Sequence, residues 1–198
     1  MWAGSRIVFH TPLRIGSKAR RTTTLSGITR KDGRTGPLTF VELTHEIAAG
    51  GEIAITDIQD LVYREPPRER AAPGAATPAP DTGARIERWA ADPVLLFRYS
   101  ALTFNGHRIH YDVPYATDEE GYAGLVVHGP LIATLMAGAA VRHRNGATLA
   151  SFEFRMLGPI FGGDPFSVHI DDTAEDVSIF VRDRNGAMAS KGTARFLR

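Results

Sequence analysis

The sequence predicts an α+β fold in which a long antiparallel sheet packs against one buried helix. Segments in which hydrophobic and polar residues alternate recur along most of the chain, as they do in strands with one buried face. Asp-Gly and Asn-Gly pairs, which favour tight hairpin turns, stand between some of these segments. Residues 129–141 form a run that is apolar on nearly all sides, which is typical of a helix enclosed by a core.

The first 64 residues predict a sheet module without a long helix. Lys31-Asp32-Gly33-Arg34 and Gly50-Gly51 are the turn signals within it. Because consecutive strands joined by short turns usually pair with each other, we expect an antiparallel meander. The strands expected in this module cover residues 6–11, 19–30, 38–48 and 53–63.

Residues 65–84 differ in composition from the segments around them. Such a segment buries too little apolar surface to offset the entropy that is lost on ordering. We interpret it as an exposed, extended linker between an incomplete N-terminal module (1–64) and a C-terminal domain (85–198). Its prolines stand among alanine, glycine and threonine at Pro66, Pro67, Pro73, Pro78 and Pro80.

The C-terminal domain is expected to hold the long helix of the chain. Residues 86–97 are expected to begin helical or irregular and to become strand-like at 94–99. Pro130 lies in the first turn of the helix at 129–141, where a proline is tolerated. After the helix, strands are predicted at residues 149–157, 166–170, 177–183 and 187–196, with a hairpin turn at Arg184-Asn185-Gly186.

The two halves of the chain share a faint internal repeat. Residues 9–16 resemble residues 154–163, since in each a phenylalanine is followed by Pro-Leu or Pro-Ile and then by glycine. Each segment precedes a strand, a hairpin turn with Asp-Gly or Asn-Gly, and a long alternating strand. Two copies of one sheet module fit this pattern, and only the second copy is preceded by a buried helix.

Composition and charge exclude several classes of function. The formal net charge is +1 at pH 7 and the arginines are scattered, which argues against the basic face that nucleic-acid binding needs. The chain has no cysteine, and hence neither disulfides nor thiolate metal sites. No apolar run approaches the roughly 20 residues of a membrane span, and the N-terminus has no apolar signal core. We therefore expect a soluble cytoplasmic protein without membrane or nucleic-acid partners.

Side chains capable of catalysis are densest between residues 102 and 112. Two imidazoles and a carboxamide, from Asn105, His107 and His110, fall within six positions. Further along, a strand-like run leads into the apolar helix, and we expect these two pieces to form one active site. The pieces are Leu102-Thr103-Phe104-Asn105-Gly106-His107-Arg108-Ile109-His110-Tyr111-Asp112 and Leu125-Val126-Val127-His128-Gly129-Pro130-Leu131.

Residues 98–136 resemble the MaoC-type hydratase/dehydratase family of hotdog proteins. The pattern of that family, Ser-Gly-Asp-x-Asn-Pro-x-His followed by Val-His-Gly, corresponds to residues 103–110 and 127–129 here. The match is closer to a branch with Phe-Asn-x-His-x-Ile-His-Tyr-Asp and Gly-Leu-Val-Val-His-Gly-Pro-Leu. That branch includes 3-methylfumaryl-CoA (mesaconyl-CoA) hydratase and related 3-hydroxyacyl-thioester dehydratases. Residues 1–6 and 60–65 are also similar to it, so the resemblance spans nearly the whole chain.

The resemblance implies a double hotdog, in which an antiparallel sheet wraps around a central helix, and a hydro-lyase reaction on an acyl thioester. The substrate would be an enoyl-CoA or a 3-hydroxyacyl-CoA, with mesaconyl-CoA as one candidate. No cofactor is expected beyond the CoA or acyl carrier of the substrate. The chain departs from the family in two respects. Asn105 stands where the family has a general-base aspartate, and the first hotdog lacks the helix that members of this branch usually carry.

The resemblance and the chemistry together indicate three catalytic residues. His110 is the expected acid/base, because an imidazole exchanges protons near neutral pH. Asn105 would orient the water that attacks the double bond. The backbone amide of Gly129, at the helix N-terminus, would stabilise negative charge on the thioester oxygen. The substrate contacts expected around them come from His107, Arg98, Tyr99, Arg108 and His128.

Other roles stay open for several of these residues. His107 is equally suited to a structural role in its loop, and His128 to capping or packing at the helix. His107 and His110 could form a metal pair, but no third ligand of matching character is evident, so no metal is expected. An arginine is more often a solvated charge than a contact for phosphate or carboxylate. Asp112 either orients His110 or begins the next turn.

Two other functions are compatible with a hotdog fold. A thioesterase is one, although residues 129–141 lack the Asp or Glu usually expected on its central helix. A non-catalytic or partner-dependent subunit that binds acyl thioesters is the other, and Asn105 and the missing helix favour it. Because a half without a helix leaves apolar surface uncovered, we further expect a homodimer or a partner hotdog subunit.

Overall fold

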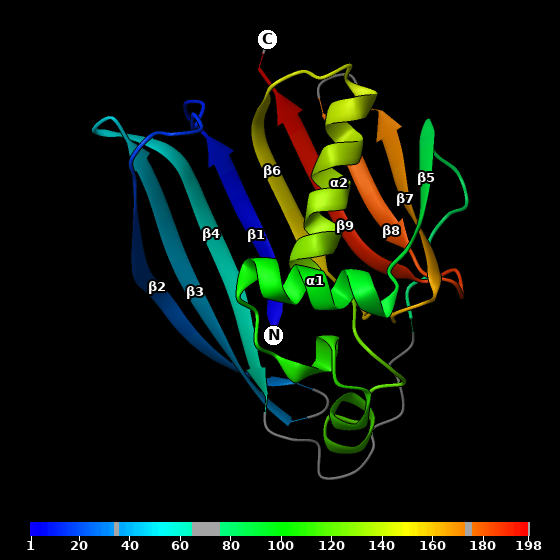
Figure 1. Ribbon diagram of the computed structural model, residues 1–198. Helices are drawn as coiled ribbons and strands as arrows, with labels where there is room; N and C mark the ends of the chain where they lie inside the picture. The colour runs from blue at the N-terminus through cyan, green and yellow to red at the C-terminus, as the bar shows by residue number, and fades with distance from the viewer. Residues whose placement is uncertain (34–35, 65–75, 173–175, 198) are drawn as a thin grey trace.

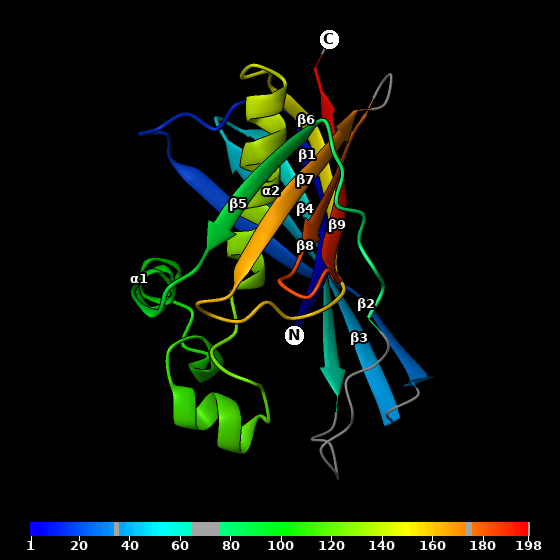
Figure 2. The ribbon, with the colours of Figure 1, turned by 90° about the vertical axis from the view of Figure 1, so that its right-hand side faces the viewer.

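One antiparallel sheet forms the frame of the molecule in the computed structural model, which describes residues 1–33, 36–64, 76–172 and 176–197. Within these residues the strand order is β2-β3-β4-β1-β6-β9-β8-β7-β5 (Figure 1). The helices α1 (Pro93–Thr103) and α2 (Gly129–His143) lie on the same side of the sheet (Figure 2). The strands are β1 (Trp2–Phe9), β2 (Ala19–Gly33), β3 (Gly36–Ala49), β4 (Glu52–Arg64), β5 (Arg85–Ala90), β6 (Leu149–Met156), β7 (Pro165–Asp172), β8 (Val177–Arg182) and β9 (Met188–Phe196).

The sheet predicted from the alternating segments is confirmed, but its first strands do not form the expected simple meander. β2, β3 and β4 follow one another, whereas β1 pairs with β4 and β6 instead of with β2. In this position Ile7 and Phe9 of β1 pack against the core. If β1 paired with the exposed strand β2 instead, these two side chains would lie at the edge of the sheet, away from the core. β1 thereby joins the two halves of the chain into one continuous sheet.

The predicted internal repeat is confirmed by the order of the strands. β1-β4-β3-β2 in the first half corresponds to β6-β9-β8-β7 in the second, and the halves meet where β1 and β6 pair. Ile7 and Phe152 are antiparallel cross-strand partners at this junction. A local two-fold axis near this pair therefore relates the halves, so a position in one half has an equivalent in the other.

The predicted apolar helix is confirmed as α2, which covers the second half of the sheet (Figure 1). Gly192 of β9 permits the close approach of α2 to the sheet, because a Cβ at this position would lie 3.2 Å from Cε of Met136 on the helix. The same Cβ would lie 2.5 Å from the carbonyl oxygen of Glu153 on the neighbouring strand β6. No helix among the described residues of 1–64 covers the first half. None of the described helices is long and apolar enough to cross a membrane. The buried residues of α2 are Leu131, Ile132, Ala133, Met136, Ala139 and Ala140.

The segment from 86 to 99 was predicted wrongly, because its strand and its helix stand in the opposite order. β5 occupies Arg85–Ala90, where Trp89 pairs with Phe166, and the apolar residues expected to be strand-like lie in α1. Asp92 begins this helix, since its side chain accepts a hydrogen bond from the Leu95 amide at 2.7 Å. Pro93 follows at a position where proline is preorganised for a helix.

The predicted linker is described only from residue 76 onward, and residues 65–75 lie outside the described residues. Its described part runs along the hairpin between β8 and β9. Pro78 forms an isolated bridge with Ala187, and the Met188 amide donates to the Thr77 carbonyl at 2.8 Å. The division of the chain into two domains at this linker stays a prediction.

Candidate active site

The two sequence motifs lie next to each other and are joined by two hydrogen bonds. The Val126 amide donates to the Ile109 carbonyl at 2.9 Å. In return, Nδ1 of His110 donates to the Val126 carbonyl at 2.7 Å. His110 ends a single helical turn, η1 (Arg108–His110), and Val126 lies three residues before α2. The loop that follows α1 is thus fixed beside the N-terminus of α2.

His110 is a buried imidazole with one nitrogen available for chemistry. Because a carbonyl oxygen only accepts, the hydrogen bond to Val126 places the proton on Nδ1 and leaves a lone pair on Nε2. Nε2 makes no hydrogen bond to the described residues, and this nitrogen is not fully enclosed. Burial lowers the pKa of His110 below its ordinary value of 6.5, against the hydrogen bond to Val126, which raises it. The ring is therefore a neutral base at neutral pH.

His128 lies under His110 and supports it. The two rings stack with their centroids 3.7 Å apart, and Nε2 of His128 hydrogen-bonds to the Ser100 hydroxyl at 2.8 Å. Burial, with a smaller contribution from His110, lowers the pKa of His128 to about 4. Its Nδ1 is enclosed and has no hydrogen-bond partner among the described residues. His128 is thus a neutral packing surface for His110 and does not reach solvent.

The neutral state of His128 predicts an acid-sensitive fold. Its pKa is about 4 in the folded chain and 6.5 ordinarily, so the unfolded chain binds more protons between these values. We expect the free energy of unfolding to fall as the pH drops from 6.5 to 4, by on the order of 2 kcal/mol from this group. Urea unfolding across this range tests the prediction. The His128→Asn variant, which keeps a partner for Ser100, should show a shallower dependence on pH, and an unchanged dependence would contradict it.

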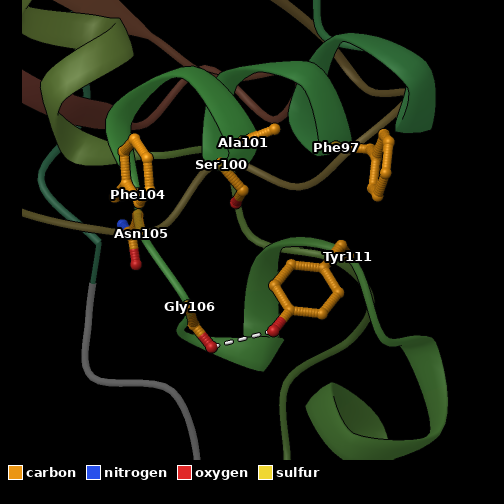
Figure 3. A pocket seen from close by; sticks show the side chains of 7 residues that line it. All are labelled: Phe97, Ser100, Ala101, Phe104, Asn105, Gly106 and Tyr111. Atoms are coloured by element: carbon orange, nitrogen blue, oxygen red, sulfur yellow. Dashed lines mark hydrogen bonds between the residues drawn. The ribbon is translucent and has the colours of Figure 1, made fainter.

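Asn105 lies where α1 gives way to the loop. Phe104 ends the helix in the left-handed conformation, with φ 53°, and the Asn105 amide donates to the Ser100 carbonyl at 2.9 Å. The side-chain oxygen of Asn105 accepts from the His107 amide at 3.0 Å. Asn105 also borders an open hollow of about 410 Å³ at the surface (Figure 3). The hollow is lined by Phe97, Ser100, Ala101, Phe104, Asn105, Gly106 and Tyr111.

Gly129 is the first residue of α2, as the sequence predicted. Its amide is one of the four at a helix N-terminus that have no partner within the helix, and Pro130 contributes none. Trp2 packs close by, because a Cβ on Gly129 would lie 3.4 Å from the indole ring. The N-terminal strand therefore borders the predicted oxyanion donor, whose role stays a prediction.

The predicted substrate contacts are not all gathered at His110. Tyr99 lies beside His128, with the two ring centroids 4.9 Å apart, and burial raises the pKa of its hydroxyl. The ring of His107 lies 5.8 Å from that of His110, but its Nε2 faces Glu120 at 3.7 Å. Their predicted roles toward substrate stay predictions.

The two predicted arginines stand apart from the histidines. Arg108 binds Asp112 at 2.7 Å and lies over the ring of Tyr115 at 4.3 Å. Asp112 also accepts from the Tyr115 amide at 3.2 Å, so it begins the next turn, η2 (Tyr115–Glu119), and Val126 orients His110 in its place. Arg98 is exposed on α1 and bonds to none of the described residues.

Ser100 is the residue at this site that the sequence did not identify. It is buried in α1, borders the hollow and holds Nε2 of His128. A serine within a mostly apolar segment was the available signal, and the expectation of a strand at 94–99 obscured it. No group of three potential metal ligands occurs within the described ranges.

An antiparallel sheet around a central helix, with a neutral buried base near the N-terminus of that helix, fits an enzyme that hydrates or dehydrates acyl thioesters. The chain belongs to the hydroxyacyl-thioester dehydratase type 2 (Htd2) family, whose model matches residues 1–162. It is 45% identical over 193 residues to the mesaconyl-C(4)-CoA hydratase of Chloroflexus aurantiacus. This match covers 98% of the chain and 69% of that relative. The hydro-lyase class predicted from the motifs is confirmed.

Solved structures confirm the predicted double hotdog. Peroxisomal multifunctional enzyme type 2 of Drosophila melanogaster superposes with a TM-score of 0.80 at 13% identity, over the whole chain and 37% of the enzyme. A Mycobacterium tuberculosis protein described as a double hotdog gives a TM-score of 0.63 at 15% identity, over the whole chain and 75% of its own. At these identities the similarity shows the fold alone.

Proposed function

We propose that the chain adds water to the double bond of an enoyl-CoA with a branched dicarboxylic acyl group, of the mesaconyl-C4-CoA type. The relative of that name supports this choice of acyl group. The proposal depends above all on His110, whose hydrogen bond to the Val126 carbonyl leaves Nε2 as a neutral base.

In the proposed mechanism, Nε2 of His110 takes a proton from a water molecule as its oxygen bonds to the β-carbon of the substrate. The same nitrogen then returns that proton to the α-carbon. Asn105 orients the water through its carboxamide. Negative charge gathers on the thioester oxygen between these steps, and the Gly129 amide stabilises it, a contribution that is typically about 3 kcal/mol for one such donor.

The test is a spectrophotometric assay of the enoyl-thioester absorbance. Purified chain with mesaconyl-C4-CoA should lose this absorbance, and crotonyl-CoA, which keeps the methyl group on the β-carbon but lacks the free carboxylate, should react more slowly. Faster reaction of crotonyl-CoA would leave the hydratase class intact and overturn the proposed acyl group. Persistence of the double bond with every enoyl thioester would overturn the proposed activity.

Asn105 allows its two proposed functions to be separated. Its oxygen anchors the loop through the His107 amide, and its amide nitrogen is the group left to orient water. We expect Asn105→Ala to lower kcat by roughly tenfold to a hundredfold, within the range for a positioned catalytic group. Asn105→Asp keeps the acceptor and loses the donor. Activity near that of the wild type in Asn105→Asp would show that the amide donor of Asn105 is not needed for catalysis.

We propose further that the chain needs no cofactor besides the CoA or acyl carrier of its substrate, and that it acts in the cytoplasm as a homodimer or with a partner hotdog subunit. The half of the sheet that no described helix covers supports such an association. Hydration by purified chain without added metal or cofactor tests the first statement.

A further inference from the structure

We infer that Ser100 is a substrate-binding residue, whose hydroxyl donates a hydrogen bond to an uncharged carbonyl oxygen of the acyl thioester in the hollow that it borders. The inference rests on the proposed function only in that the ligand is an acyl thioester. Three features of the chain support it: the direction of the hydrogen bond between Ser100 and His128, the absence of a bond from Ser100 to its own helix, and the lining of the hollow.

The first feature is the single proton of the His128 ring. The pKa of His128 is about 4, so the ring is neutral at neutral pH and carries one proton. Its Nε2 lies 2.8 Å from the Ser100 hydroxyl oxygen, whereas its Nδ1 is enclosed without a partner among the described residues. A proton on Nδ1 would leave an enclosed N–H without an acceptor, which is rarer in folded proteins than a lone pair without a donor. The proton therefore lies on Nε2, and the ring donates to Ser100.

The second feature is that α1 does not accept the hydroxyl proton of Ser100. A hydroxyl has one proton and two lone pairs, so Ser100 keeps its proton when it accepts from His128. Hydroxyls within helices can donate to the carbonyl four residues earlier. Thr103 and Thr134 do so, to carbonyl oxygens at 2.7 and 2.8 Å. Ser100 has no such bond to Leu96, and in the described part of the chain its hydroxyl bonds only to His128.

The third feature is the hollow of about 410 Å³ that Ser100 borders. The Ser100 side chain points from α1 toward the loop that carries Gly106 and Tyr111 (Figure 3). Because Ser100 is only 6% exposed, this hollow is the open space next to its hydroxyl. A hydroxyl proton that stays buried without an acceptor is costly. Water in the hollow, or a ligand that displaces this water, is therefore the acceptor left for the proton.

The walls of the hollow favour an uncharged ligand. Phe97, Ala101 and Phe104 give it apolar surface, and none of the described residues that line it is charged. A charged group placed against these walls would lose part of its hydration without gaining an ion pair. The ligand is therefore expected to carry an uncharged polar atom among apolar neighbours.

The polar side chains of the hollow favour a ligand that accepts hydrogen bonds. The Tyr111 hydroxyl donates to the Gly106 carbonyl at 2.8 Å, so its proton is used within the loop. The side-chain oxygen of Asn105 accepts from the His107 amide at 3.0 Å, which leaves the NH₂ group as a donor. Together with the Ser100 hydroxyl, two side-chain donors border the apolar hollow. In an acyl thioester the matching acceptor is a carbonyl oxygen, either of the thioester or of an amide in the arm that carries the acyl group.

A double-mutant cycle separates contact with substrate from support of His110. Ser100→Ala should lower kcat/KM for crotonyl-CoA by about three- to tenfold, the usual effect of losing one uncharged hydrogen bond. His128→Phe keeps an aromatic ring beneath His110 and removes the bond to Ser100. In this background Ser100→Ala should lower kcat/KM by a similar factor, because the hydroxyl still reaches the substrate. No further loss in the combined variant would show that Ser100 acts only through His128, and would overturn the inference.

A thioester without amide groups identifies the carbonyl oxygen. With S-ethyl thiocrotonate, a loss in Ser100→Ala equal to that with crotonyl-CoA would assign the thioester carbonyl. A loss confined to crotonyl-CoA would assign an amide of the arm, and no loss with either substrate would overturn the inference. Thr117→Ala is the matched control, since it removes an exposed hydroxyl that is bonded to the Val113 carbonyl at 3.1 Å. Circular dichroism checks that every variant folds.

Binding of butyryl-CoA tests Ser100 independently of hydration, because this thioester has no double bond. Calorimetry should give a Kd that is about three- to tenfold higher for Ser100→Ala and unchanged for Thr117→Ala. An unchanged Kd and an unchanged kcat/KM in Ser100→Ala would overturn the inference and leave the proposed function intact. Binding that depends on Ser100, in a wild-type chain that hydrates no enoyl thioester, would support the inference and overturn only the proposed function.

Discussion

Replacement of His110 by alanine is expected to lower kcat for hydration of an enoyl thioester by roughly a hundredfold to ten-thousandfold, the usual contribution of a general acid/base. The residue is held by one hydrogen bond to the Val126 carbonyl and by stacking on His128. The substitution thus removes the proposed base and leaves the contacts of the Asn105 side chain in place. The rate of absorbance loss at saturating substrate measures the effect.

The pH dependence of the same reaction provides an independent check. Burial lowers the pKa of His110 below 6.5, and the neutral form is the base. Hydration by the wild-type chain should therefore be at its plateau at neutral pH and fall as the pH decreases below that pKa. His110→Ala should lose this limb of the profile. His107→Ala is the control, because His107 is half-exposed and faces Glu120. An undiminished rate in His110→Ala would show that the proposed mechanism is wrong.

Substitution of Gly192 by alanine is expected to lower the free energy of unfolding by about 3 kcal/mol, near the upper end for an overpacked core. The added Cβ would meet the Glu153 carbonyl oxygen at 2.5 Å and Cβ of Phe154 at 3.0 Å. The first of these is backbone, which cannot turn aside. Relief requires β9 to move away from β6, and this would disturb the packing of α2 through Met136.

Urea unfolding followed by circular dichroism measures this loss. Gly158→Ala is the matched control, because no atom lies within 4 Å of a Cβ at that position and its backbone is not in the left-handed region. Its stability should change by less than about 0.5 kcal/mol, as for other substitutions away from packed sites. Equal stability of the two variants would show that β9 and α2 are not packed as described.

Much of the sheet was predictable because alternation and turn signals are local properties. The strands on either side of Gly50-Gly51 and the apolar helix at 129–143 were identified in this way. The helix at 93–103 was not, because a short apolar run fits a strand and a helix equally well. Asp92 and Pro93 were the signals that decide between them. The position of β1 between β4 and β6 depends on which of its faces can be buried, and no local pattern states this.

The motif residues of the site were predictable, but several of their contacts were not. The sequence singled out His110 and Gly129 as parts of one site, and the folded chain brings their segments together. The stack of His110 on His128, and the hydrogen bond from Ser100, join residues 18 and 28 positions apart through the tertiary fold. Asp112 was weighed as a partner for His110, yet the nearer Arg108 holds it.

The acceptor that orients His110 is a backbone carbonyl. The orientation of the ring is therefore separate from the charge beside it, although these two properties are coupled in many acid/base sites. Where a carboxylate holds a histidine, one substitution changes both the orientation and the charge beside the ring. Here any side chain at position 126 leaves the carbonyl in place. The tautomer of His110 is therefore a property of the chain path, while its proton affinity can be tuned separately through the apolar residues that enclose it.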